Sequence, residues 1–119
     1  METTIEQLAH AALQREGLRV RSLAQDLLRE TDSYQDFPRP ATNDLSTLVM
    51  AAALVELLAI RQNQRPPAWV HEIGAMPEPF FLLEMASHMK RLRTLCETQS
   101  PEPLRKRKLY APPNFLPFA

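Results

Sequence analysis

Apolar side chains recur at helical spacing near the start of this chain. An apolar stripe with a period near 3.6 residues runs from Ile5 to Leu13. Thr3 and Glu6 have the spacing of a capping box, and Gly17 is a residue type that commonly ends a helix. The pattern therefore predicts a first helix that begins after Thr3 and closes at Gly17.

Two further helices are predicted in the first half of the chain. Residues 21–31 repeat the apolar spacing and carry a similar start signal at Ser22. Residues 44–64 form the strongest pattern, with Asn43 or Asp44 as the capping residue. Because this segment is apolar on most of its sides, we expect a central helix that its neighbours bury.

Prolines divide the second half into shorter elements. Pro66 and Pro67 end the central helix, and residues 67–79 form a predicted loop. Residues 80–98 predict a helix and residues 101–108 a short last helix, followed by a proline-rich ending. The apolar face of the longer helix would consist of Leu82, Met85, Met89, Leu92 and Cys96. No segment alternates between apolar and polar residues, so no strand is expected.

These elements together predict an all-α protein. It would be a small helical bundle of about five helices with a proline-rich, partly extended C-terminal segment. Residues 1–65 would form an N-terminal bundle around the buried central helix, and residues 66–119 would pack on it to complete one compact domain. Eleven prolines against two glycines agree with stiff connections and few tight turns.

Charge is balanced overall but differs between the halves. Residues 1–60 hold five Lys/Arg against nine Asp/Glu, a net charge of −4, and residues 61–119 hold nine against five, a net charge of +4. Such asymmetry steers association rather than folding. The single cysteine, Cys96, is expected to be a small core residue on a helix. With no signal peptide and no membrane-spanning run predicted, we expect a soluble cytoplasmic protein.

The sequence contains no arrangement typical of catalysis. His10, His71 and His88 lie far apart and have no further ligands at metal-binding spacing. Two isolated glycines cannot build a phosphate-binding loop, and no nucleophile stands in a known pattern with a base. We therefore predict a protein that is not an enzyme and holds neither cofactor nor metal.

Glu56 is a charged residue inside the apolar run of the central helix. The residues one turn away, Ala52, Ala53 and Ala59, are small. Because glutamate is seldom fully buried, we expect Glu56 to be exposed and to mark a narrow solvent-facing side. The alternative is a buried carboxylate paired with an arginine of this chain or of a partner, since unpaired burial is costly.

Aromatic residues beside prolines are the first candidates for binding. The set comprises Trp69, Phe80, Phe81, Tyr110, Phe115 and Phe118. Stiff loops lose little entropy on binding and aromatic rings supply contact area, which suits interface anchors. Alternatively, these rings cover the chain's own core. We favour this second interpretation for Phe80 and Phe81, and we weigh the two interpretations equally for Trp69.

Basic residues are the second set of candidates. They are Arg105, Lys106, Arg107 and Lys108, joined by Lys90, Arg91 and Arg93. A solvated run of charge is the ordinary explanation, and zero net charge is atypical of a nucleic-acid-binding chain. An acidic protein partner is also open, and arginines would contact it.

Two other classes of function are kept as alternatives. The first two predicted helices suggest a small helix-turn-helix-like DNA-binding regulator with Arg19 and Arg21 as contacts, although this region is net acidic. The alanine-rich central helix suggests a structural adaptor or a self-associating helical protein.

Three motifs in the second half are distinctive in combination: "PPAWV", "PEPFFL" and "LRTLCETQSPEPLRKRKLYAPPNFL". Together they resemble a group of small bacterial proteins encoded beside nucleotidyltransferase-like proteins, in the manner of toxin–antitoxin pairs. The resemblance spans residues 66–118 and is looser over residues 18–65. The recurring residues would be Trp69, Pro79, Phe80, Ser100, Pro101, Leu104, Arg105, Arg107, Asn114 and Leu116.

The resemblance implies a non-catalytic partner, an antitoxin that binds and neutralises a cognate nucleotidyltransferase-fold toxin. Such enzymes hold metal ions with carboxylates, so a cationic segment could replace the charge of the metal. We expect binding through Trp69, Phe80, Phe81, Arg105, Arg107, Tyr110, Asn114, Phe115 and Leu116.

Overall fold

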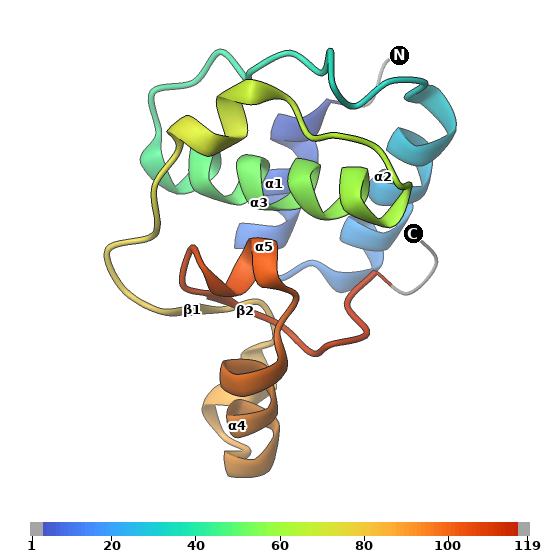
Figure 1. The fold of residues 1–119 in the computed structure, drawn as a ribbon. Coiled ribbons are helices and arrows are strands. Elements are labelled where there is room, and N and C mark those ends of the chain that lie inside the picture. The colour runs from blue at the N-terminus through green and yellow to red at the C-terminus, as the bar shows by residue number, and fades with distance from the viewer. Residues whose placement is uncertain (1–3, 117–119) are drawn as a thin grey trace.

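A computed structural model describes residues 4–116, apart from the side chains of Glu84 and Ser87. The α-helices in this range are α1 (Ile5–Leu13), α2 (Gly17–Glu30), α3 (Leu45–Arg61), α4 (Lys90–Gln99) and α5 (Glu102–Arg105). Two 3-10 helices, η1 (Ala68–Glu72) and η2 (Glu84–Ser87), and two short strands, β1 (Phe80–Phe81) and β2 (Leu109–Tyr110), complete it. The protein is therefore mainly helical, with a two-stranded sheet (Figure 1).

The predicted central helix is confirmed as α3. The Asp44 side chain caps it by accepting a hydrogen bond from the Thr47 N–H at 3.2 Å. Every residue from Thr47 to Ala59 is buried. Figure 1 shows α3 through the middle of the fold, where it packs against α1, η1 and α5. Each large apolar side chain buried there contributes about 1.5–3 kcal/mol.

The start of α1 lies one residue later than the sequence pattern predicts. Thr4 is the N-cap: its Oγ1 accepts from the Gln7 N–H at 3.2 Å, and its own N–H donates to Gln7 Oε1 at 3.1 Å. The predicted pairing of Thr3 with Glu6 is therefore wrong, and Thr3 lies outside the described residues. Thr4 and Gln7 have the same spacing as Thr3 and Glu6, so the sequence motif alone does not distinguish the two registers.

The turn between α1 and α2 does not use its glycine as predicted. Arg15 takes the left-handed conformation, with φ of 56°, while Gly17 has a negative φ and is the first residue of α2. The second helix therefore begins well before Ser22, where the sequence pattern placed its start. Val20 packs inward from the added turn and is 6% exposed.

The absence of strands and the helix over residues 80–98 are both wrong predictions. Phe80 pairs with Leu109 and Phe81 with Tyr110 in a parallel two-stranded sheet. Two-residue strands are too short for any alternation of polarity, and the partner segment is distant in the sequence. Helix α4 consequently begins only at Lys90.

Two smaller predictions about the second half agree with the structure at least in part. The short last helix is confirmed in part, as the single-turn α5. Cys96 is a fully buried residue on α4, as expected. Burial, together with the negative charge of Glu97, raises the pKa of its thiol, which is typical of an unreactive cysteine. None of the helices in residues 4–116 combines the length and apolar character that a bilayer span requires.

Candidate protein-interaction surface

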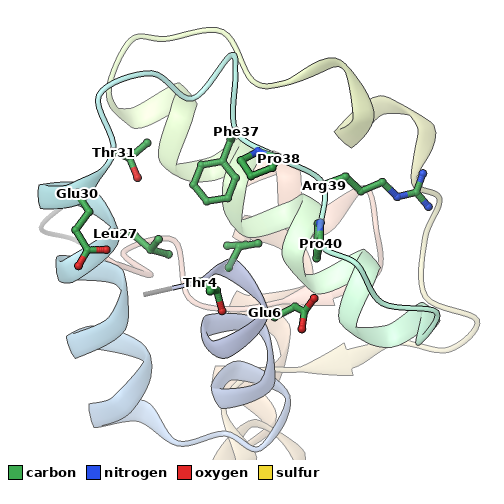
Figure 2. Close-up of a pocket in the computed structure, with 10 residues that line it drawn as sticks. Thr4, Glu6, Leu27, Glu30, Thr31, Phe37, Pro38, Arg39 and Pro40 are labelled. Carbon is green, nitrogen blue, oxygen red and sulfur yellow. The ribbon is translucent and has the colours of Figure 1, made fainter. Parts of the chain in front are cut away.

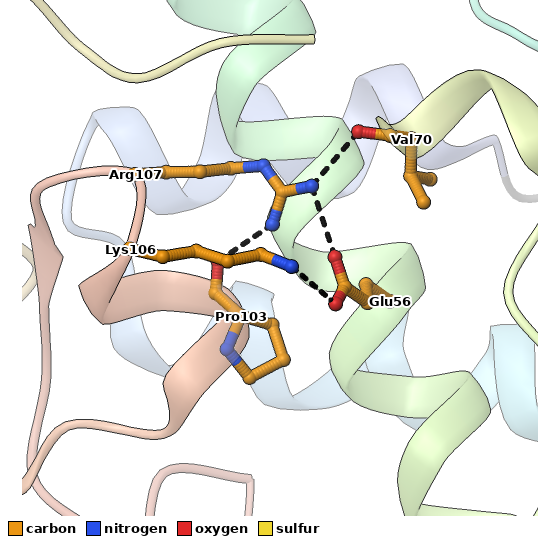
Figure 3. Close-up of polar contacts among 5 residues, drawn as sticks. All are labelled: Glu56, Val70, Pro103, Lys106 and Arg107. Carbon is orange, nitrogen blue, oxygen red and sulfur yellow. Dashed lines mark hydrogen bonds and ion pairs between the residues drawn. The ribbon is translucent and has the colours of Figure 1, made fainter. Parts of the chain in front are cut away.

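A cluster of charges around the buried Glu56 and Arg107 holds the C-terminal segment on α3. Lys106 Nζ lies 2.7 Å from Glu56 Oε2, and Arg107 Nη2 lies 2.9 Å from Glu56 Oε1 (Figure 3). The Glu56 side chain is 7% exposed and that of Arg107 is 4% exposed. The expected exposure of Glu56 is therefore wrong, and the alternative of a buried pair with an arginine of this chain is confirmed.

Arg107 also binds two backbone carbonyls from other parts of the fold. Its Nη1 donates to the Pro103 oxygen at 2.8 Å, and its Nη2 donates to the Val70 oxygen at 2.9 Å (Figure 3). Its Nε has no hydrogen-bond partner among the described residues. One guanidinium thus joins α3, η1 and the segment that leads into β2, which fixes the path of that segment.

The electrostatics of Glu56 follow from this arrangement. Burial alone raises the pKa of the carboxyl, because it disfavours the charged form. The hydrogen bond from Lys106, the contact with Arg107 and their two positive charges outweigh burial and hold the pKa below its ordinary value. Glu56 therefore remains ionised, and the cluster serves the fold.

The predicted aromatic anchors are only half-buried and pack on the core. Trp69 lies on η1, and its indole N–H donates to the Phe37 carbonyl at 2.8 Å. Phe80 lies under the guanidinium of Arg15, 4.6 Å from the ring centroid. The rings of Phe81 and Tyr110 meet across the sheet with centroids 5.3 Å apart. Each of these side chains is therefore partly exposed.

The other predicted contact residues lie in the last part of the chain. Leu116 is buried and Phe115 half-buried, and the Arg61 guanidinium donates to both of their carbonyls. Asn114 and Arg105 are exposed, and Arg105 donates through Nη1 to the Thr98 carbonyl at 3.0 Å. Phe118 lies outside the described residues. Apart from the buried Arg107 and Leu116, each described member of the predicted set reaches the surface at least in part.

A projecting arm carries apolar side chains that the sequence placed in the core. We define the arm as residues 83–99, which contain η2 and α4; α4 packs chiefly against η2 and extends away from α1–α3 (Figure 1). Leu83, Met85 and Met89 are 40%, 62% and 48% exposed. Met85 and Met89 were predicted to face inward on one long helix. The 3-10 turn breaks that helix and turns both side chains outward.

Cations adjoin this apolar surface. Lys90 and Arg91 follow Met89 directly in the first turn of α4, and both are exposed. Arg93 is bound locally, since its Nε lies 2.9 Å from the Glu97 carboxylate and its guanidinium sits over the Phe81 ring. The arm therefore presents apolar and positive groups side by side.

A surface pocket opens on the opposite part of the fold. It occupies about 420 Å³ between the start of α1, the end of α2 and residues 37–40. Figure 2 shows Leu27, Phe37 and Pro40 around it, with Glu6 and Glu30 at its sides and Arg39 extending outward. Its lining includes no histidine, cysteine or lysine. We assign it no catalytic role.

Comparison with protein-family models, with curated proteins and with solved structures found no match to this chain. Within residues 4–116 no cluster of His, Cys, Asp and Glu side chains could hold a metal ion. The assignment of function therefore depends on the surface of the protein.

Proposed function

We propose that this chain is a non-catalytic protein-binding partner, antitoxin-like, which binds and restrains a nucleotidyltransferase-like protein. The observation that carries the proposal is the exposed apolar surface of the arm, formed by Leu83, Met85 and Met89. Exposed apolar groups gathered on a projection are typical of protein interaction sites.

The composition of the arm suits a protein partner. Methionine is unbranched and polarisable, so Met85 and Met89 can adapt to an irregular apolar surface. Lys90 and Arg91 beside them would contact acidic groups at the rim of the interface. Arg105 adds a further exposed cation on α5.

The nature of the partner rests on the resemblance of the second half to proteins encoded beside nucleotidyltransferase-like proteins. Such enzymes bind metal ions with clustered carboxylates, which cations from the arm and from Arg105 would meet. Contact area around the cations would come from the half-buried side chains of Trp69, Phe81 and Tyr110 and from the proline-rich ending.

The test is co-purification with the nucleotidyltransferase-like protein encoded beside this chain. Replacing Met85 and Met89 together by serine should weaken the complex at least about tenfold. The matched control is Leu45→Ser, which changes a 54% exposed leucine on α3 outside the arm. Unchanged binding of the arm variant, or equal loss in the control, would refute the role of the arm; absence of any complex would refute the partner.

Point variants are needed because truncation is uninformative. A chain that ends after Thr98 lacks Arg107 and the buried Leu104 and Leu109, so α3 would lose both the apolar cover from α5 and the counter-charges of Glu56. Loss of binding by such a chain would report unfolding rather than a missing contact.

The DNA-binding alternative finds less support on α2. Arg19 lies 3.6 Å from Glu16, the residue before α2, and Arg29 forms an ion pair with Asp26, so each of these arginines already has a carboxylate beside it. A gel shift on the upstream promoter with Arg19→Ala and Arg21→Ala separates this function from protein binding.

A further inference from the structure

An apolar groove lies at the base of the arm. It has a volume of about 220 Å³ and lies between the α1–α2 turn, the residues after β1 and the end of the described chain. Its apolar lining includes Val20, Leu82, Phe115 and Leu116, and Arg15 and Arg21 are its exposed cationic members. A groove of this size accommodates one large apolar side chain.

The apolar surface continues beyond the groove on the α2 side. Leu18 follows Gly17, which itself lines the groove, and is 87% exposed, the highest exposure among the large apolar side chains of the described residues. Leu83 lines the groove on the arm side and is 40% exposed. A segment that extends from the groove along the start of α2 would also cover Leu18, at about 1.5–3 kcal/mol for full burial of a leucine.

The charges around the groove are positive although this half of the chain is acidic. Arg15 and Arg21 line the groove, and Arg19, which pairs with Glu16, lies between them in the sequence. Arg15 is held in place, because its Nε donates to the Phe81 carbonyl at 2.9 Å and its guanidinium stacks on Phe80. A positive rim, of which Arg15 is held in place, is complementary to an apolar side chain flanked by carboxylates.

The same charges disfavour other occupants. A second copy of this chain, placed around a two-fold axis at Leu18, would bring two sets of three arginines together. A nucleic acid would set phosphates against the exposed Leu18 and leave the apolar groove empty.

We propose that this groove binds an amphipathic segment of a partner protein, with one large apolar side chain inserted between Val20 and Leu82 and acidic residues facing Arg15 and Arg21. The groove shares Leu83 with the arm, but the inference is tested at Leu18 and Arg21, which lie outside the arm, and it leaves the origin of the segment open.

The experiment is a selection of peptides from a random 16-residue library displayed on phage, with the full-length protein as bait. We expect the enriched peptides to carry leucine, phenylalanine or methionine flanked by aspartate or glutamate. Their affinity, measured by fluorescence anisotropy, should fall about tenfold or more with Leu18→Ser and with Arg21→Glu. The matched controls are Leu45→Ser and Arg65→Glu, two exposed positions outside the groove, which should leave affinity unchanged.

Each other outcome overturns the inference. Failure to enrich peptides, enrichment without acidic residues, or equal losses in the control variants would show that the groove is not such a site. Self-association that Leu18→Ser abolishes in light scattering would identify a second copy as the occupant. Binding of a labelled DNA duplex that Arg21→Glu abolishes and Leu18→Ser leaves intact would identify a nucleic-acid surface. Circular dichroism of each variant confirms that it is folded.

Discussion

Arg107 directs its guanidinium at the carboxylate of Glu56 inside the protein, at 2.9 Å, and neither side chain is more than 7% exposed. Removing two such charges from water costs free energy that their attraction offsets only when further hydrogen bonds satisfy the groups. Here the carbonyls of Val70 and Pro103 accept from the same guanidinium. The pair is therefore coupled to the geometry of three separate segments.

Removing the charge of Glu56 should destabilise the protein strongly. Glu56→Gln leaves Arg107 buried without a counter-charge, and breaking a buried pair in this way costs about 3–5 kcal/mol. Urea unfolding followed by the fluorescence of Trp69 measures the loss. The control is Glu97→Gln, since the exposed pair of Glu97 with Arg93 should contribute at most about 1 kcal/mol. Equal effects of the two variants would contradict the buried cluster.

The contribution of Glu56 should disappear in acid. Its folded-state pKa lies below the ordinary carboxyl value of 4.5, so its stabilisation is complete above that value and is lost as the pH falls through the folded pKa. The difference in unfolding free energy between the parent chain and Glu56→Gln should be constant at neutral pH and shrink below 4.5. A difference that grows in acid would contradict the assignment. The pKa of Asp44 is also lowered, by its hydrogen bonds with Thr47. Asp44 is present in both proteins, so its contribution to the pH dependence cancels in the difference.

Ser100 should stabilise the junction between α4 and the residue after β2. Its buried hydroxyl accepts from the Ala111 N–H at 2.9 Å and lies within reach of the Cys96 carbonyl. Ser100→Ala leaves that buried N–H without a partner, which costs about 1–3 kcal/mol. Thermal or urea unfolding measures this loss of stability, with Thr98→Ala on the exposed side of α4 as the control. A neutral Ser100→Ala would show that water replaces the hydroxyl.

The arm should tolerate polar substitution without loss of stability. Met85→Ser and Met89→Ser change side chains that are 62% and 48% exposed, so each should alter the free energy of unfolding by at most about 0.5 kcal/mol. Leu54→Ala in α3, which changes a fully buried side chain, should cost about 2–5 kcal/mol under the same conditions. Strong destabilisation by the arm variants would mean that their side chains are packed and the surface is not available to a partner.

Local patterns predicted those elements whose signals are local. Helix α3 follows from its apolar residues and from the cap at Asp44, both of which are read within a few positions. The burial of Cys96 on its helix follows in the same way, although it lies within the arm and not in the core cluster. The capping box of α1 was found in the wrong register, because Thr3 and Thr4 each fit the motif.

Long-range pairings could not be predicted in the same way. Phe80 and Phe81 form a strand only because Leu109 and Tyr110 lie beside them, and two residues carry no period of their own. The burial of Glu56 depends on Arg107, which the sequence presents as one of four consecutive cations. The exposure of Met85 and Met89 results from the same rearrangement, since the sheet displaces the start of the predicted helix.

The charged partners of Glu56 are synthesised well after Glu56 itself, because they lie 50 and 51 residues later in the chain. A domain generally folds as a unit, so it cannot close completely before its last packed segment has been synthesised. α1, α2 and α3 emerge while Arg107 is still unmade, and in that interval the carboxylate of Glu56 has no internal counter-charge. The side of α3 that carries Glu56 therefore cannot take its native form until Lys106 and Arg107, which follow α5, have been added to the chain.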